Sequence, residues 1–503
     1  MATSAASSKL PVHTKLLYGL GSMSDGAQLQ LVGGILLLYY NQILKMPPQW
    51  VSLALGIALF IDAFWDAFIG YVSDNLRTPL GRRHPLMYFS ILPAGLAFTA
   101  LWLPPAGLSQ PQLFAWLLGF VVAFRMAHSC FMVPAWALTP ELAPDYHERT
   151  VVIGYRWMLG ASGGAITAAL VYGVYFHKTA QFALGQLNPA AYPPMAITIG
   201  LFISATILIA TLGTHPYIGQ LHRPPVRRMD LVQSVKEVAA TFNNHNFMVA
   251  LIAGAVGATS VALGQGLTIY FNTYLFELPA SSIMLTILTL FVSGPLAFLI
   301  APAVSRRLGK RIGCMTLFFT SLAFTHGPIV LRLLHLLPAN HSPALLPILI
   351  GAGTVSGVLS MGGWILSSSM IADITEETQL KTGRRSEALL YYADQLMYKV
   401  VSGMATVLPG LLLAFVAFPQ HASPATLDPG VMRRLGLAYV LIAGTLSAAS
   451  IGTWRFYRID QAAHEHHLAT IEEAVAALDE PLIAGGPPIA GLAPGAPAAL
   501  GVA

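Results

Sequence analysis

Charged residues are scarce in this chain. Only 10% of its 503 residues are Asp, Glu, Lys or Arg, whereas 55% are hydrophobic and the mean hydropathy is +0.64. Soluble globular domains carry about 25% charged residues, so this composition excludes a string of soluble domains and predicts a bundle of helices in a lipid bilayer. The formal net charge of +5 does not indicate a nucleic-acid-binding surface, because the basic residues form short clusters between apolar segments.

Cysteine is almost absent. Only Cys130 and Cys314 occur, each within or beside an apolar run. Two isolated cysteines indicate neither a disulfide framework nor a metal site. The first residues, "MATSAASSKLPVHTK", also lack the short apolar core of a cleavable signal. We therefore expect the first apolar run to remain in the protein as a membrane anchor.

Long apolar runs are abundant, by contrast. A helix needs about 20 apolar residues to cross a bilayer, and the chain read at that scale predicts twelve transmembrane helices. The expected fold class is therefore an all-α membrane protein. The twelve spans are expected near 16–44, 49–75, 86–104, 112–140, 150–175, 192–214, 246–277, 282–304, 312–336, 344–372, 387–417 and 433–455.

Lysine and arginine mark one side of the membrane. They gather in the connections after the predicted spans two, six, eight and ten, and cytoplasmic loops carry such an excess. These clusters lie at 77–83, 223–236, 306–311 and 381–385. The opposite side has few basic residues, although Arg433 and Arg434 depart from the pattern. The balance predicts an integral protein of the cytoplasmic or inner membrane, with both termini in the cytoplasm.

A weak internal repeat divides the chain in two. The stretch "VSDNLRTPLGRR" follows the second predicted span, and a shorter counterpart, "VSRRLGKR", follows the eighth. Two halves of six helices, related by a pseudo-twofold axis, indicate a transporter with its site between them. We expect an N-terminal half, a central cytoplasmic loop, a C-terminal half and a largely disordered cytoplasmic tail, at residues 1–216, 217–245, 246–456 and 457–503.

Two carboxylates lie inside the apolar segment "FIDAFWDAFIGYVSD". Asp62 and Asp66 are four residues apart, so both side chains project from one helix face. Burial and mutual repulsion both disfavour two negative charges there, so either one carboxyl group holds a proton or a cation lies between them. The alternative is permanent neutralisation by an arginine, for which Arg125 is the candidate.

Other ionisable residues also fall within predicted spans, where each costs roughly 2.5–3.5 kcal/mol at the bilayer centre. Arg156 and Lys399 indicate either a cavity for an anionic or hydroxyl-rich ligand or a lock that pairs each of them with an acid. His128 offers a hydrogen bond or a ligand, unless its role is structural. Trp364, in "GGWILSSSM", either stacks on a sugar or fills the core.

Three blocks of the sequence carry a resemblance to a known family. They read "DAFWDAFIGYVSDNLRTPLGRRHP", "VPAWALTPELAPDYHERT" and "MIADITEETQLKTGRRSEALLYYADQLMYK". With them, the chain resembles the glycoside–pentoside–hexuronide:cation symporters, the melibiose-permease-like family of the major facilitator superfamily. The resemblance covers the chain from "KLLYGLGSMSDG" to about Leu413. It implies the major facilitator fold and a small-molecule substrate, with the lipid bilayer as the other partner, and we expect a monomer.

The resemblance implies a role for the acid pair. In this family, two acids one turn apart on the second helix hold the coupling cation, and a hydroxyl of the fourth helix assists. The matching positions here are Asp62, Asp66 and Ser129. The implied coupling ion is Na⁺ or H⁺, with both aspartates as metal ligands if it is sodium, and no other cofactor is expected. Trp65 stands where the family often has a polar residue, which leaves sodium and proton both open.

The resemblance also implies a sugar site, with departures. Arg156, Trp364 and Lys399 fit family positions, whereas Gly26 replaces the acid of the first helix and Met132 replaces the acid of the fourth. A galactoside-type site is therefore not assumed. The candidate substrate residues are Asp25, His128, Met132, Arg156, Trp364, Asp394 and Lys399, and Arg125 faces either the substrate or the acids.

The charged cytoplasmic connections resemble gating elements of the superfamily, although a solvated loop that only sets topology is the alternative. The candidate gating residues are Asp74, Arg77, Arg82, Arg83, Asp373, Glu376, Arg384, Arg385 and Glu387. The resulting hypothesis is cation-coupled symport of a sugar or glycoside by alternating access, without catalysis. The alternatives are a lysolipid or amphiphile transporter of the same fold and a membrane sensor that transports nothing.

Overall fold

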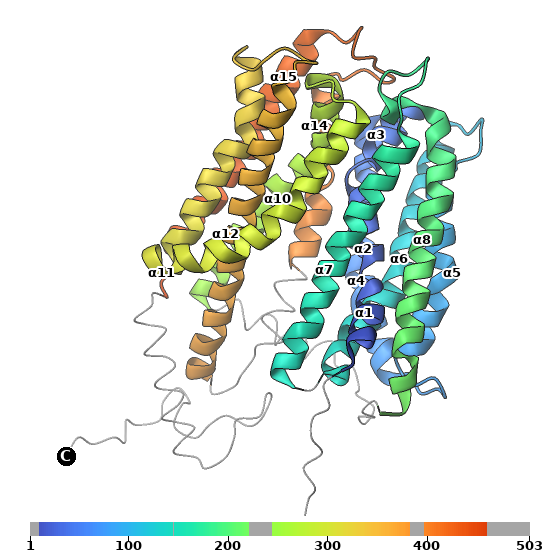
Figure 1. Ribbon diagram of the computed structural model, residues 1–503, viewed down its shortest axis with the longest axis vertical. Helices are drawn as coiled ribbons and strands as arrows, with labels where there is room; N and C mark the ends of the chain where they lie inside the picture. Colours follow the sequence, from blue (N-terminus) through green and yellow to red (C-terminus); the bar gives the residue numbers. More distant parts are fainter. Residues whose placement is uncertain (1–9, 144, 221–243, 383–396, 460–503) are drawn as a thin grey trace, which may run out of the picture.

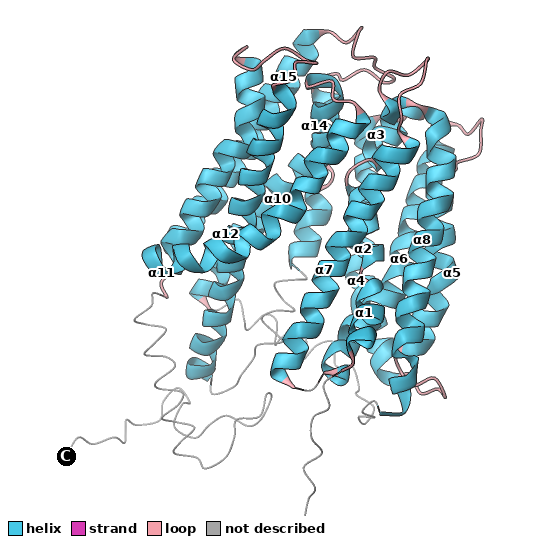
Figure 2. Ribbon diagram, viewed as in Figure 1, coloured by secondary structure: helices cyan, strands magenta, loops and turns pink. Residues whose placement is uncertain are grey.

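The computed structural model describes residues 10–143, 145–220, 244–382 and 397–459 (Figure 1). Throughout these residues the regular structure is helical, and none of it is a named strand (Figure 2). The predicted central loop and the predicted tail lie outside the described residues, apart from residues 217–220, 244–245 and 457–459. The predicted division into halves therefore stays a prediction at those boundaries.

In the first half, five short helices precede a series of longer ones. These are α1 (Val12–Leu20), α2 (Met23–Gln28), η1 (Leu29–Gly33), α3 (Leu36–Leu38), η2 (Tyr39–Ile43), α4 (Pro48–Asn75), α5 (His84–Leu101), α6 (Gln110–Leu142), α7 (Tyr146–Leu170), η3 (Val171–Tyr175) and α8 (Tyr192–Thr214). The second half contains α10 (His245–Tyr270), η7 (Phe271–Leu275), α11 (Ala280–Leu333), α12 (Leu345–Thr382), the helical segment Met397–Phe415 with α14 (Leu408–Phe415), and α15 (Pro429–Thr453).

Ten helices among the described residues are long and apolar enough to cross a membrane. The count of twelve spans stays a prediction with which this arrangement is consistent. The 54-residue α11 covers two predicted spans and breaks at Gly309, whose φ of 74° lies in the left-handed region that favours glycine. The first predicted span covers the short helices α1 to η2, which are too broken to count as one long helix.

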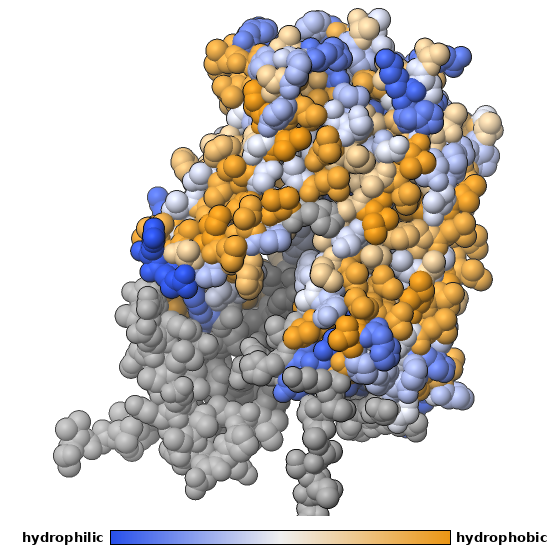
Figure 3. Space-filling view, viewed as in Figure 1, coloured by the Kyte–Doolittle hydropathy of each residue, from blue (hydrophilic) through white to orange (hydrophobic). Residues whose placement is uncertain are grey.

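The outer faces of the bundle are apolar. On α5, Phe89, Leu92 and Leu96 point outward and are each more than 60% exposed, whereas Phe98 and Leu101 on the opposite face are fully buried. A helix that is apolar all round suits a lipid environment. Figure 3 shows apolar side chains across the middle of one face and hydrophilic side chains towards its ends. The arrangement is that of an integral membrane protein.

The two halves meet at one end of the bundle, at the top of Figure 1. There, the hydroxyl of Tyr270 donates to Asn41 Oδ1 at 3.0 Å, and that of Tyr274 donates to Gln42 Oε1 at 3.1 Å. The same Gln42 side chain donates to the Pro419 carbonyl and accepts from the Ala422 amide. We call this network of buried amides and phenols the end seal.

Below the end seal, α4 packs closely on the helical segment Met397–Phe415. A Cβ atom added at Gly56 would lie 2.6 Å from Val407 Cγ2 and 2.9 Å from the carbonyl oxygen of Gly403. Farther along the same contact, the Gly410 amide donates to Ser52 Oγ at 3.0 Å. Small residues permit such an approach of two membrane helices. The contact brings α4 of one half against the eleventh predicted span of the other.

Substitution of Gly56 tests this contact. We expect Gly56→Ala to lower the apparent Tm of the purified protein, because overpacking of a tight contact costs roughly 1–3 kcal/mol. The matched control is Gly119→Ala on α6, where an added Cβ meets no atom within 4 Å; this change is expected to be neutral or stabilising. Thermal unfolding in detergent measures the apparent Tm of both variants. Equal Tm values for the two would contradict the close contact at Gly56.

Candidate functional site

Asp62 and Asp66 project from one face of α4, as their spacing predicts. That face is turned towards the second half of the protein, where Lys399 contacts both carboxylates. The bulky residue between them points elsewhere, because Trp65 Nε1 donates to the Met126 carbonyl of α6 at 3.0 Å. Trp65 therefore links α4 to α6 of the same half. Its indole does not occupy the face of α4 that carries the two carboxylates.

Asp62 is the more enclosed of the two acids, with 5% of its surface exposed. Ser129 Oγ, on α6, donates to Asp62 Oδ1 at 3.0 Å, so the structure brings together the predicted hydroxyl and the predicted acid. Arg125 Nη1, one turn earlier on α6, lies 3.6 Å from Asp62 Oδ2. Of the two alternatives for Arg125, this structure has the guanidinium paired with an acid of α4.

Lys399 of the second half completes the cluster. Its ammonium lies 3.3 Å from Asp62 Oδ2 and also contacts Asp66 Oδ2. The structure places this predicted substrate residue in contact with both acids, and its role towards a substrate stays a prediction. The formal charges of Asp62, Asp66, Arg125 and Lys399 cancel, which offsets the cost of burying each one. We call these four residues the charge cluster.

Side chains in and beside the charge cluster offer oxygen ligands for a small cation, but among the described residues they do not form a complete metal site. Asp62, Asp66 and Ser129 present carboxylate and hydroxyl oxygens, the ligands that hard cations prefer, and Asp66 Oδ1 is buried without a hydrogen-bond partner among the described residues. Within those residues, no group of three or more His, Cys, Asp or Glu side chains could hold a metal.

Two further predicted residues lie near this cluster. His128, on α6, is buried, and its Nε2 lies 3.0 Å from Ser24 Oγ of α2. Asp25 is exposed and lies within electrostatic range of Arg125 and His128. At the neighbouring position, a Cβ added at Gly26 would lie 2.1 Å from the Gly160 carbonyl, so the close packing of α2 on α7 leaves no room for an acid there.

Arg156 is held within the first half. Its guanidinium donates to the Tyr18 hydroxyl at 2.7 Å and to the Ala135 carbonyl at 2.8 Å, and it lies 3.8 Å from the centre of the Trp136 ring. The side chain is 2% exposed, so these contacts leave little of it for a ligand in this structure. Met132 is partly buried and packs against the core of the same half.

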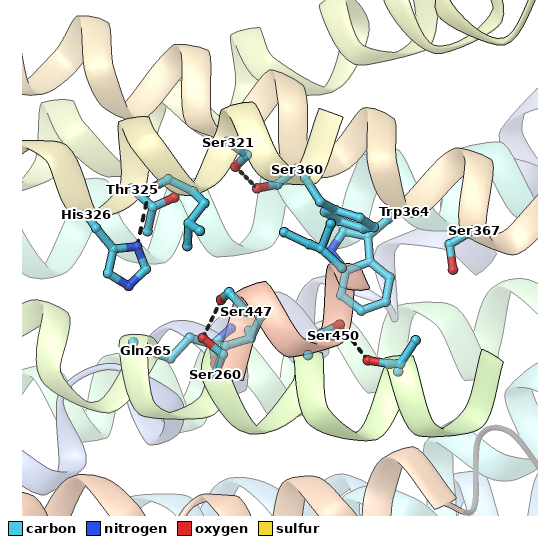
Figure 4. Close-up of a pocket in the computed structure, with 18 of the residues that line it drawn as sticks. Ser260, Gln265, Ser321, Thr325, His326, Ser360, Trp364, Ser367, Ser447 and Ser450 are labelled. Atoms are coloured by element: carbon cyan, nitrogen blue, oxygen red, sulfur yellow. Dashed lines mark hydrogen bonds between the residues drawn. The ribbon is translucent and has the colours of Figure 1, made fainter. Parts of the chain in front are cut away.

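Trp364 lies apart from the charge cluster, in a pocket of the second half (Figure 4). The pocket is lined by residues of α10, α11, α12 and α15 and by Trp454, and has a volume of about 280 Å³. Trp364 is 39% exposed and meets Phe318 edge to face, with ring centres 5.8 Å apart. The predicted substrate residue Asp394 lies outside the described residues.

The predicted gating residues of the first half pair within that half. Arg83 Nη1 lies 2.6 Å from Asp74 Oδ1, and both Arg82 and Arg83 pair with Glu141 at the end of α6, at 2.7 and 3.0 Å. Arg77 is exposed. Glu141 was not predicted, although it stands in the block "VPAWALTPELAPDYHERT" that carried the resemblance. An acid at the end of an apolar helix was the available signal.

The second half repeats this arrangement. Lys310, in the counterpart stretch "VSRRLGKR", pairs with the buried Asp373 of α12 at 2.7 Å. In both halves, a basic residue after one helix therefore meets an acid near the end of another, two predicted spans later. The internal repeat seen in the sequence thus extends to ion pairs. The candidates Arg384, Arg385 and Glu387, and the side chain of Glu376, lie outside the described residues.

Comparison with known proteins agrees with this architecture. The pattern of a family described as MFS/sugar transport proteins matches residues 17–461. The isoprimeverose transporter of Lactiplantibacillus pentosus is 22% identical and aligns over 90% of both chains. An uncharacterized symporter of Synechocystis is 32% identical over 34% of this chain and 32% of its own, so that alignment covers about a third of each protein.

Other similarities are limited, either in the length that aligns or in sequence identity. The sodium-dependent lysophosphatidylcholine symporter 1 of Mus musculus is 31% identical over 32% of this chain and 31% of its own. Among solved structures, a mutant of the nucleoside transporter NupG superposes with a TM-score of 0.60 at 13% identity, over 88% of this chain and 99% of its own. At that identity the likeness concerns the fold alone.

The family match covers most of the chain, and the solved neighbour has the same fold. The predicted resemblance and the predicted fold class are therefore confirmed, as is the expectation of a transporter rather than an enzyme. The chain belongs to the family of MFS/sugar transport proteins, within the major facilitator superfamily.

Proposed function

We propose that this protein couples the movement of Na⁺ or H⁺ to that of a sugar or glycoside, in symport by alternating access. The observation that carries the proposal is the charge cluster. One ammonium group, from Lys399 of the second half, contacts two carboxylates of the first half, Asp62 and Asp66. An incoming cation and Lys399 would compete for the same carboxylate oxygens, so ion binding acts directly on the link between the halves.

The accessibility of the cluster supports such an exchange. The side chain of Lys399 is 36% exposed and that of Asp66 is 24% exposed, whereas Asp62 is enclosed. An ion can therefore approach from the side of Asp66. Once a cation or a proton neutralises the acids, Lys399 loses its ion pairs with them. The halves then lose one of the interactions that join them. Substrate and ion then favour the same conformation, and by linkage each raises the affinity for the other.

The proposed substrate follows from the family and from its full-length relatives. The relative named as an isoprimeverose transporter aligns over nine-tenths of the chain, whereas the lysophosphatidylcholine symporter aligns over a third. A sugar is therefore the first candidate, and a lysolipid is the second. We further propose that the protein acts as a monomer in the cytoplasmic or inner membrane, with both termini cytoplasmic and the end seal on the opposite side.

Gradient-driven uptake into liposomes tests the function. We expect an imposed Na⁺ or H⁺ gradient to drive accumulation of a member of a sugar panel that includes isoprimeverose, and the effective gradient identifies the ion. Asp62→Asn and Asp66→Asn should abolish accumulation, because loss of a charge-assisted contact costs on the order of 1.5–3 kcal/mol, or roughly 10- to 100-fold in affinity.

The matched control for these variants is Asp428→Asn. Asp428 caps α15 through its contact with the Gly430 amide at 2.9 Å, and asparagine caps equally well. Accumulation of lysophosphatidylcholine alone would favour the second candidate. Failure of every panel member under both gradients would instead contradict symport and favour a sensor.

Replacement of Lys399 tests whether its ammonium competes with a cation for the two carboxylates. If its ammonium occupies the carboxylates until a cation displaces it, Lys399→Met should shift cation-dependent thermal stabilisation to a concentration about tenfold lower, a change of roughly 1.4 kcal/mol. Lys399→Arg retains the charge and should leave the midpoint near that of the unmodified protein. A weaker response to cations in Lys399→Met would show that the lysine assists ion binding, and would rule out the exchange.

A further inference from the structure

The two halves repeat each other in sequence but differ in charge at the end of the bundle away from the end seal. In the second half, exposed arginines surround the break of α11, and Figure 3 shows strongly hydrophilic side chains at the place where Figure 1 labels α11. We propose that this surface binds the phosphate headgroup of an anionic phospholipid in the adjoining leaflet of the bilayer. We call it the basic edge; it consists of Arg306, Arg307, Lys310, Arg311, Arg455 and Arg458.

The internal repeat locates the difference in charge. The stretches "VSDNLRTPLGRR" and "VSRRLGKR" begin with the same Val-Ser pair and end with a glycine followed by two basic residues. These glycines, Gly81 and Gly309, both have a φ of 74°, so the two turns share a backbone conformation that favours glycine. With the stretches aligned in this way, Arg306 stands at the position of Asp74. The second half therefore has a cation where the first half has an acid.

That exchange removes an internal counter-charge. In the first half, Asp74 Oδ1 lies 2.6 Å from Arg83 Nη1, so an acid next to the connection neutralises one of its basic residues. In the second half, Lys310 forms the counterpart of the pair with Glu141, and its ammonium lies 2.7 Å from the nearer carboxylate oxygen of Asp373. Arg306 instead adds to the positive charge of its own connection. Like charges at this spacing repel each other, and an anion from outside the connection would relieve the repulsion.

A second group of arginines lies against the first. Arg311 Nη1 donates to the Tyr457 carbonyl at 3.0 Å, and this contact holds the segment after α15 beside the break of α11. Arg455 and Arg458 belong to that segment. All five arginines of the basic edge are exposed, and none has an ion pair among the side chains that the structure describes. Guanidinium groups in this state are suited to phosphate, because their fork of N–H donors matches its oxygens.

Exposed apolar side chains accompany the arginines. Leu308 and Ile312 of α11 are 44% and 52% exposed, and Phe456, which follows Arg455, is 51% exposed. The Arg455 guanidinium lies 4.7 Å from the centre of the Phe456 ring. Earlier on α11, Phe298 is 71% exposed and belongs to the apolar outer face of the bundle. The basic edge thus lies at the boundary between that face and the polar end of the bundle, which is the level of the phospholipid headgroups.

This combination favours a phospholipid over a soluble anion. Free phosphate would use the guanidinium groups and leave the apolar side chains in water. A phospholipid provides a phosphate for the guanidinium groups and acyl chains for the apolar side chains. Clusters of basic residues next to a transmembrane helix are typical sites for anionic lipids. The proposed lipid site depends only on the membrane setting of the fold, and not on the substrate or the coupling ion.

Native mass spectrometry of the full-length protein in detergent tests the lipid site. We expect the first bound dioleoyl-phosphatidylglycerol to have an apparent Kd at least about fivefold lower than the first bound dioleoyl-phosphatidylcholine, because the choline cation balances the phosphate of the latter. In the double variant Arg306→Gln, Arg307→Gln, this preference should fall below about twofold. The double variant Arg306→Lys, Arg307→Lys retains both charges and should retain most of the preference.

A matched pair of arginines provides the control. Arg433 and Arg434 are also adjacent and exposed, but they lie at the start of α15, at the opposite end of the bundle. The double variant Arg433→Gln, Arg434→Gln should leave the preference for phosphatidylglycerol unchanged. An equal loss in the two glutamine variants would show that only the net charge of the protein matters, and would overturn the proposal. The absence of a preference in the unmodified protein would overturn it as well.

Competition distinguishes a lipid site from a general anion site. Inorganic phosphate should not displace bound phosphatidylglycerol, and its displacement at equal concentrations would overturn the assignment to a lipid. The apparent Tm in detergent shows whether each variant is folded. If Arg306→Gln, Arg307→Gln does not fold, the double variant Arg455→Gln, Arg458→Gln tests the same surface from its other element, with the same loss expected. A retained preference in that variant would contradict the proposal.

Discussion

The shared ammonium of Lys399 is the interaction on which the rest of the structure depends. It connects Asp62 and Asp66 of one half to the other half, across an interface that also includes close helix packing and the uncharged end seal. Burial of two carboxylates would be unfavourable without it, and Arg125 alone reaches only Asp62. A single positive charge thus stabilises the acid pair and joins the halves at once.

Charged and uncharged polar side chains occupy different places among the described residues. Charged groups gather where the halves meet. Each half also contains an internal ion pair, Arg83 with Glu141 in the first and Lys310 with Asp373 in the second. Uncharged hydroxyls and aromatic rings gather in the pocket of the second half. The described lining of that pocket thus contains none of the charged side chains that join the halves.

The fold was largely predictable from the sequence because the bilayer imposes a fixed length on each apolar run. The second span was predicted at 49–75 and α4 covers Pro48–Asn75. The acid pair and Ser129 were predictable from helical spacing and from the family motif. The contact of Lys399 was not, because 337 positions separate it from Asp62 and spacing on one helix does not reveal which helix faces it. The interruptions of the first span, and the burial of Arg156 among hydroxyls, likewise depend on tertiary packing.

The contact of Gly56 with Gly403 has a mechanical consequence. The absence of a side chain at both glycines brings the two helix backbones close together, and this close contact is a natural fulcrum for a change in the tilt of α4. At 1.5 Å per residue, Asp62 lies about 9 Å from the pivot and Asn75, the last residue of α4, about 28 Å. The helix is thus a lever with an arm ratio of about three. A displacement of one ångström at Asp62 would therefore become about three at the far end of the helix.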